Sequence, residues 1–129
     1  MHLFNQILAT KEQFKALVHE YPKGQPVVMV NLLKFTGEDG RKSYQTYSRN
    51  MAPLLEKAGA KVIWSGNVNL TVIGDSEDQP DMVILVEYPS TQHFIDMATS
   101  AEYKVVGQDR EGALVYGGLL ASTGIGMFG

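Results

Sequence analysis

The chain has 129 residues, of which 44% are hydrophobic and 19% are charged, and its formal net charge at pH 7 is −3. This length and balance predict one folded domain, residues 1–129, and exclude a disordered chain or a coiled coil. The mild charge, without a Lys/Arg cluster, predicts no nucleic-acid partner, and the absence of cysteine removes disulfides, thiolate metal sites and thiol nucleophiles.

The start of the chain carries no basic n-region, and its apolar run is too short for a signal peptide. No stretch approaches the roughly 20 apolar residues that a membrane-spanning helix needs. A protein without cysteine suits a reducing compartment. We therefore expect a cytoplasmic protein with no membrane association.

The first predicted element is a short amphipathic helix over residues 10–21, which precedes the main domain at 26–121. Thr10 and Gln13 form a capping-box pattern at its start, and Pro22 ends it. Between them, apolar residues recur at helical spacing: Phe14, Leu17, Val18 and Tyr21.

Two segments, 27–35 and 82–88, are predicted strands with apolar residues on both faces. Side chains alternate between the faces of a strand, so a surface strand should alternate with polar residues, and within the apolar runs 27–33 and 82–88 only Asn31 and Glu87 are polar. Both faces of the sheet must therefore be covered. We expect helices on one face and a second copy of the protein on the other.

A polar loop at 36–40 and a long helix are expected to follow the first strand. One face of this helix carries Tyr44, Tyr47, Met51, Leu54, Leu55 and Ala58. Gly59 is placed to end the helix in the left-handed conformation. Pro53 lies inside the helix and removes one backbone hydrogen bond, which predicts a kink or an early break.

Residues 62–72 are predicted to form a half-buried strand, because apolar residues occupy most of its even positions. Gly66 marks either a bulge or a close backbone approach. The acidic turn at 74–81 then joins this strand to the strand at 82–88 as a hairpin.

The last third of the chain is predicted to hold helical segments and one more strand. Ser90 is placed as the N-cap of a helix, and Ser100 can cap a further turn or two. A short strand follows at 113–121. The Gly-rich tail, 122–129, has little to hold it unless a partner chain does.

The predicted order within 26–121 is strand, helix, strand, strand, helix, strand. This is the split βαβ arrangement of the ferredoxin-like α+β fold, with a four-stranded antiparallel sheet and two main helices on one face. Two such sheets packed face to face make a dimeric α+β barrel. The expected partner is therefore the protein itself, as a homodimer.

Several segments resemble one known family: 30–35, Tyr44 with Tyr47, 87–90, and 100–103 followed by Arg110. They resemble the domain of unknown function 1330 family, a small bacterial family in the dimeric α+β barrel superfamily. The resemblance covers about residues 26–121 and implies the fold and the dimer. Its superfamily includes cofactor-independent quinone-forming monooxygenases, muconolactone isomerase-like enzymes, haem-using enzymes and stress-responsive proteins, so the resemblance implies no single function.

Asn31 and Glu87 are candidate site residues because each is a polar group in an otherwise apolar strand. In a functional interpretation, they lie in a pocket between sheet and helices, where Asn31 donates to a ligand oxygen and Glu87 accepts a proton. In a structural interpretation, they satisfy fold contacts, and Glu87 near its strand end pairs with Arg110 or another base.

Aromatic and basic residues supply the other ligand-binding candidates: Tyr44, Tyr47, Trp64, Tyr103 and Arg110. The two phenols at 44 and 47 form either a core stripe or, if their hydroxyls converge with Asn31, a site for a polarised carbonyl or enolate. Trp64 is expected under a helix or at the dimer seam, or stacked on a flat ligand. Arg110, two helical turns after Tyr103, either holds a ligand carboxylate or pairs with an acid of the fold.

His93 is the second candidate proton carrier, although a solvated position near a helix start is the alternative. The three histidines lack neighbours at ligand spacing, and no glycine motif cradles phosphate, so we expect neither a metal nor a cofactor. Two functions stay open. One is a cofactor-independent monooxygenase or isomerase acting on a small acidic or aromatic metabolite, and the other is a non-catalytic dimeric ligand-binding or structural module.

Overall fold

Four strands form one antiparallel sheet in the order β2-β3-β1-β4. In the computed structural model, which describes residues 4–125, the strands are β1 (Val27–Phe35), β2 (Lys61–Asn67), β3 (Met82–Tyr88) and β4 (Leu114–Ser122). The first and third strands lie in the centre, which is the ferredoxin-like arrangement. The predicted α+β class and the β2–β3 hairpin are confirmed.

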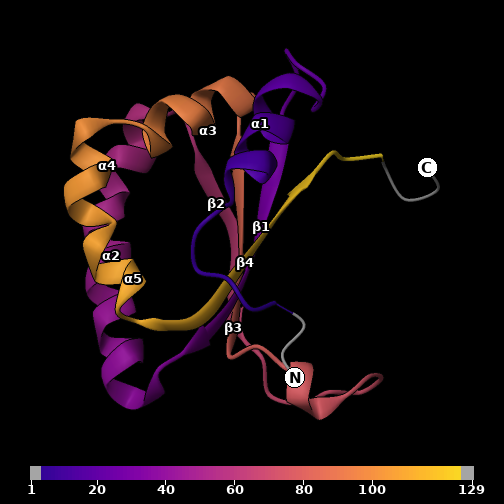
Figure 1. The fold of residues 1–129 in the computed structure, drawn as a ribbon, viewed down its shortest axis with the longest axis vertical. Helices are drawn as coiled ribbons and strands as arrows, with labels where there is room; N and C mark the ends of the chain where they lie inside the picture. The colour runs from indigo at the N-terminus through magenta and orange to yellow at the C-terminus, as the bar shows by residue number, and fades with distance from the viewer. Residues whose placement is uncertain (1–3, 126–129) are drawn as a thin grey trace.

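The helices gather on one side of this sheet (Figure 1). They are α1 (Lys11–His19), α2 (Gly37–Lys57), α3 (Thr91–Ala98), α4 (Ala101–Val106) and α5 (Gln108–Glu111). A 3-10 turn, η1 (Ser76–Asp78), lies in the loop between β2 and β3, which projects away from the helices. Within residues 4–125, none of the helices has the length and apolar character required to cross a bilayer.

Local side-chain caps explain where several helices begin. Thr10 and Gln13 form the predicted capping box, with reciprocal hydrogen bonds of 3.1 and 2.9 Å. Ser90 and Ser100 each accept a hydrogen bond from the backbone N–H three residues later, at 3.3 and 3.2 Å. Gly59 follows α2 with φ +70°, the left-handed conformation expected after a helix.

The predicted loop at 36–40 is wrong, because α2 already begins at Gly37. The polar residues form the first helical turn, where the negative charges of Glu38 and Asp39 interact favourably with the positive end of the helix dipole. The helix also continues through Pro53 to Lys57, so the early break does not occur.

β2 corrects the prediction for residues 62–72 in two ways. The strand ends at Asn67, and Ile73 further along the chain is 95% exposed. The pairing of β2 with β3 shifts by one residue between Val62 and Trp64. Val62 therefore pairs with Val86 and faces the helices, whereas Trp64 pairs with Leu85 and faces the opposite side of the sheet. Gly66 is therefore the site of a close approach: a Cβ there would lie 2.4 Å from the Trp64 ring.

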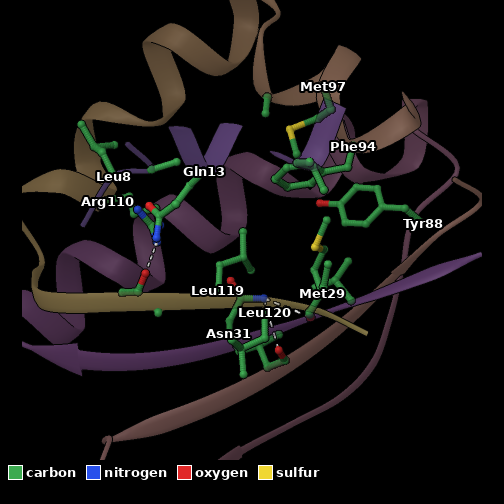
Figure 2. Close-up of a pocket in the computed structure, with 18 of the residues that line it drawn as sticks. Leu8, Gln13, Met29, Asn31, Tyr88, Phe94, Met97, Arg110, Leu119 and Leu120 are labelled. Atoms are coloured by element: carbon green, nitrogen blue, oxygen red, sulfur yellow. Dashed lines mark hydrogen bonds between the residues drawn. The ribbon is translucent and has the colours of Figure 1, made fainter. Parts of the chain in front are cut away.

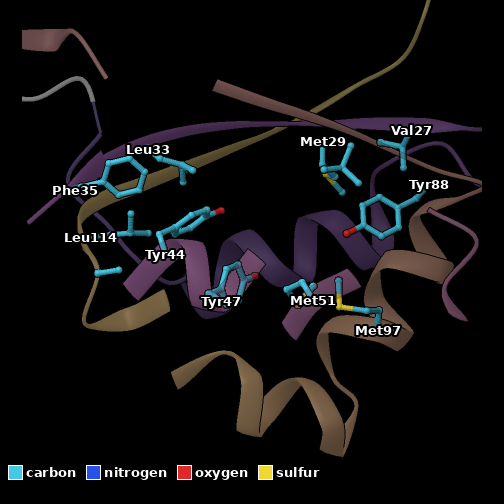
Figure 3. Close-up of a cluster of buried hydrophobic side chains, with 12 residues drawn as sticks. Val27, Met29, Leu33, Phe35, Tyr44, Tyr47, Met51, Tyr88, Met97 and Leu114 are labelled. Carbon is cyan, nitrogen blue, oxygen red and sulfur yellow. The ribbon is translucent and has the colours of Figure 1, made fainter. Parts of the chain in front are cut away.

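The core lies between the helix-facing side of the sheet and α2 (Figure 3). Its β1 residues alternate along the strand, and aromatic residues of α2 pack on them. The main members are Val27, Met29, Leu33, Phe35, Tyr44, Tyr47 and Met51. Asn31 occupies the one polar position in this alternation.

The opposite side of the sheet, which we call the open face, is apolar and half-buried in the single chain. It carries Val28, Val30, Leu32, Val83 and Leu85. Trp64 lies on this face with 54% of its surface exposed, so it does not pack under a helix. In the tail, Ser122 belongs to β4, while residues 126–129 lie outside the described part of the chain.

Candidate functional site

A cavity of about 1010 Å³ lies between the helix-facing side of the sheet and the helices (Figure 2). Residues 4–9 and α1 form one wall, α2 and α3 form another, and β1, β3 and β4 supply the floor. Among its lining residues only Glu20 and Arg110 carry charge, and Glu20 is exposed. The cavity is therefore mainly apolar, with one buried cation.

Arg110 is held at this cavity by backbone carbonyls. Only 8% of its surface is exposed. Its Nη1 donates to the Ile7 carbonyl at 2.6 Å, and its Nη2 donates to the Gly117 carbonyl at 3.4 Å. Among residues 4–125, no carboxylate forms an ion pair with it. A buried charge without a counter-charge is costly, so the site favours an anion.

Tyrosines surround the buried arginine. The hydroxyls of Tyr47 and Tyr103 lie 3.3 Å apart, and the rings of Tyr44 and Tyr47 are 5.1 Å apart. Burial raises the pKa of Tyr44 to about 12, although the charge of Arg110 opposes this rise. Burial likewise raises the pKa of Tyr47 and of Tyr88. At neutral pH these groups are neutral phenols, which can donate hydrogen bonds but cannot act as bases.

The end of the cavity away from Arg110 is lined by thioethers and aromatic rings (Figure 2). Met29 and Met97 lie there beside Tyr88 and Phe94, whose rings meet edge to face at 5.2 Å. Methionine is flexible and polarizable, so this end can adapt to a flat or branched apolar group.

Asn31 lies on the floor of the cavity, as predicted. Its Nδ2 donates to the carbonyls of Ile84 at 3.2 Å and of Met29 at 3.4 Å. These strand contacts use its amide hydrogens, so the atom left for a ligand is the acceptor Oδ1. The predicted donation from Asn31 to a ligand oxygen is therefore wrong, because its amide hydrogens are bonded to strand carbonyls, although the side chain does line the cavity.

The two predicted proton carriers lie elsewhere. Glu87 pairs in register with Val28 and faces the open side of the sheet, where it lines a separate cavity of about 250 Å³. The predicted pairing of Glu87 with Arg110 is therefore wrong, because the two side chains lie on opposite faces. His93 is exposed at the start of α3, where Nδ1 lies 2.7 Å from Ser90 Oγ.

Of the predicted ligand-binding residues, the cavity brings together Asn31, Tyr44, Tyr47, Tyr103 and Arg110 and leaves out Trp64. Sequence reasoning missed the contribution of residues 4–9 and of Gly117, which gives Arg110 its space: a Cβ there would lie 2.5 Å from Nη2. In the described part of the chain, no three acidic or histidine side chains gather to hold a metal ion.

Comparisons with known proteins agree with this fold. The family model described as "Domain of unknown function (DUF1330)" matches residues 32–122. A protein of unknown function from Rhodopseudomonas palustris is 28% identical, with a TM-score of 0.86, and the match covers 94% of this chain and 98% of that one. No curated protein matches the chain.

Two more distant structures show the fold alone. A protein from Bacteroides fragilis, described as dimeric and ferredoxin-like, is 14% identical with a TM-score of 0.55, over 79% of this chain and 98% of that one. A candidate antibiotic biosynthesis monooxygenase from Bacteroides thetaiotaomicron is 11% identical with a TM-score of 0.57, over 78% of this chain and 90% of that one. Neither assigns a reaction to this cavity.

Proposed function

Because the chain belongs to the DUF1330 family, whose description assigns no activity, we propose its function from the cavity: the protein binds a small organic carboxylate with an apolar or aromatic body. The observation that carries this proposal is Arg110, a buried cation that lines the cavity and has no acidic partner among residues 4–125. A ligand carboxylate supplies the missing charge and matches the guanidinium in bidentate geometry.

The other lining residues support the rest of the ligand. Tyr44 lies beside the arginine, and its neutral hydroxyl can donate to the same carboxylate. Met29, Met97 and Phe94 give an apolar end for a ring or a short chain. The ligand class is therefore a monocarboxylate with one polar and one apolar end.

Between the two functions left open by the sequence, the geometry favours the ligand-binding module. Neither Glu87 nor His93 lines the main cavity. The buried tyrosines keep their protons at neutral pH, because burial raises the pKa of Tyr44, Tyr47 and Tyr88. A bound molecule in this cavity thus meets hydrogen-bond donors and a buried cation, and the one carboxylate of the lining, Glu20, is exposed at its surface.

We further propose that the protein is a cytoplasmic homodimer in which two open faces pack together. The apolar, half-buried residues of that face support this arrangement, with Trp64 and Leu85 paired across β2 and β3. The relative from Bacteroides fragilis is described as dimeric. The cysteine-free sequence supports a reducing compartment.

A thermal-shift screen of matched carboxylates and amides tests the ligand class. We expect phenylacetate and benzoate to raise the Tm, whereas phenylacetamide and benzamide have little effect. The effect should vanish in Arg110→Gln and persist in Arg49→Gln, which removes an exposed arginine of α2. Equal stabilisation by acids and amides, or by wild type and Arg110→Gln, would refute carboxylate recognition. Native mass spectrometry of gently purified protein then identifies the co-purifying acid.

A second candidate function is a cofactor-independent monooxygenase, favoured by the hydroxyl pair of Tyr47 and Tyr103 near the buried cation. Such donors stabilise an enolate or phenolate that reacts with O₂. Since the cavity has no buried base, the substrate must arrive already ionised, and the rate should rise with pH through the substrate's own pKa. Oxygen consumption with phenolic carboxylates measures this rate. If no oxygen is consumed at any pH, the monooxygenase function is refuted and the ligand-binding function stands.

A further inference from the structure

Residues 4–9, which we call the edge strap, cross the free edge of β4 from one face of the sheet to the other (Figure 1). At one end, the Phe4 ring packs over Gly118, with its centroid 6.1 Å from that of Tyr116. In the middle, the Gln6 carbonyl accepts a hydrogen bond from Gly117 N–H at 2.8 Å. At the helix-facing side, the Ile7 carbonyl accepts from Arg110 at 2.6 Å.

The edge strap is also a wall of the ligand cavity. Every one of its residues lines that cavity. A side-chain hydrogen bond links it to α1: Gln6 Nε2 donates to Gln13 Oε1 at 2.9 Å, and the same oxygen accepts from Thr10 N–H. Because α1 itself has no buried residue, this wall is anchored by few contacts and is the part of the site best able to open locally.

Counting donors shows that the strap and a ligand can hold Arg110 together. A guanidinium has five N–H groups in one plane; the Ile7 and Gly117 carbonyls accept from two of them, and the Tyr44 hydroxyl accepts from a third, which leaves two for a ligand. Two parallel N–H groups suffice for a carboxylate. A bound acid therefore adds to the Ile7 contact instead of replacing it, and the short charge-assisted bond to Ile7 fixes the plane in which the acid binds.

We propose that the edge strap completes the carboxylate site: Ile7 positions the Arg110 guanidinium, and a bound acid locks residues 4–9 against β4. This inference rests on the proposed carboxylate-binding function. The linkage is reciprocal, so an acid that stabilises the docked strap must bind more weakly whenever strap docking is weakened. The specificity of the site then depends on residues that precede the family-matched region at 32–122.

Two substitutions weaken the strap without touching Arg110. Gln6→Ala removes the side-chain hydrogen bonds from Gln6 to Leu8 and Gln13. Gln13→Ala removes Gln13 Oε1, the oxygen that accepts from both Gln6 and Thr10, and with it the capping box. Gln13→Glu supplies a carboxylate oxygen as acceptor for both bonds and should restore strap docking, read as hydrogen exchange of residues 5–9; because Gln13 lines the cavity, its new charge excludes it as a control for phenylacetate affinity. Lys15→Ala is the matched control, because Lys15 is exposed on the same helix and does not line the cavity.

The experiment follows phenylacetate binding by calorimetry and hydrogen exchange of residues 5–9 by mass spectrometry. In wild type, phenylacetate should slow exchange of this segment. Gln6→Ala and Gln13→Ala should weaken phenylacetate binding by about threefold to tenfold, as expected for one lost hydrogen bond, and should speed exchange of 5–9. Lys15→Ala should match wild type in both measurements, and Gln13→Glu should match it in hydrogen exchange of residues 5–9.

The outcomes separate the two claims. If phenylacetate binds in an Arg110-dependent manner but leaves exchange of 5–9 unchanged, the strap inference is overturned and the carboxylate site stands. If both glutamine variants bind phenylacetate as tightly as Lys15→Ala, the strap inference likewise fails. If no carboxylate of the panel binds wild type, the proposed function fails and the strap inference with it.

Discussion

Replacing Gly117 with alanine tests whether the space beside Arg110 is essential. The new Cβ would lie 2.5 Å from Arg110 Nη2 and 2.8 Å from Leu114 Cδ1, whereas ordinary contacts are 3.4–4 Å. Both neighbours are nearly fully buried, so each must retreat by about 1 Å. Such overpacking costs about 1–3 kcal/mol. Reduced freedom of the unfolded chain offsets about 0.4–1 kcal/mol of this.

We therefore expect Gly117→Ala to lower the free energy of unfolding by about 1–2 kcal/mol and the Tm by about 3–10 °C. Urea denaturation followed by circular dichroism measures the first, and phenylacetate titration should show about tenfold weaker binding. The matched control is Gly112→Ala, because a Cβ at Gly112 meets nothing within 4 Å. If both variants are equally stable and bind phenylacetate equally well, Arg110 is not fixed by this contact.

Three further predictions concern the buried tyrosines, one helix cap and the open face. Burial raises the pKa of Tyr44, Tyr47 and Tyr88, so above about pH 10 these tyrosines lose their protons in the unfolded chain before they do so in the folded protein. Each of the three tyrosines should therefore lower the free energy of unfolding by roughly 1 kcal/mol per pH unit above pH 10. Urea midpoints at pH 9 and pH 11 measure this loss, and equal midpoints contradict it. Ser90→Ala should cost about 1 kcal/mol, since it removes the cap of α3, and unchanged thermal unfolding would argue against that cap. Leu85→Glu should place a charge on the open face beside Trp64 and convert a dimer into a monomer in sedimentation velocity; a wild-type protein that sediments as a monomer rules out the proposed packing.

The sheet was predictable because its evidence is local. Residues 27–33 and 82–88 are short apolar runs of strand length bounded by turn residues, and such a run is recognised without distant information. Helix starts at Thr10, Ser90 and Ser100 were likewise predictable, since each cap bonds within three residues.

β2 was predictable in existence but not in register. The bulge between Val62 and Trp64 adds one residue to the strand and places the two side chains on opposite faces. Ile63, the extra residue, is apolar like its neighbours, so the sequence pattern gives no sign of the slip. Of the two positions expected for Trp64, under a helix or at a dimer seam, the slip excludes the first and places the side chain on the open face.

The candidate site was predictable only in part, because its geometry depends on the face of the sheet from which each polar side chain projects. Asn31 falls in the alternation of Met29 and Leu33 and so reaches the cavity floor. Glu87 alternates with the buried pair Val86 and Tyr88 and so faces away. Since neighbours on both sides of Glu87 are apolar, the sequence alone could not decide its face.

The surroundings of Arg110 were the hardest part to predict, and they carry most of the functional argument. Two acids, Asp109 and Glu111, flank it in sequence, yet both are exposed while the arginine is buried, because consecutive residues of a helix point in different directions. The acceptor that replaces them is the carbonyl of Ile7, which is 103 residues distant in the chain. A carbonyl dipole compensates a buried guanidinium less completely than a carboxylate does. A carboxylate ligand at ten times its Kd should therefore add about 1.4 kcal/mol to the stability of the wild-type protein and nothing to Arg110→Gln, since only the arginine supplies the unmatched charge.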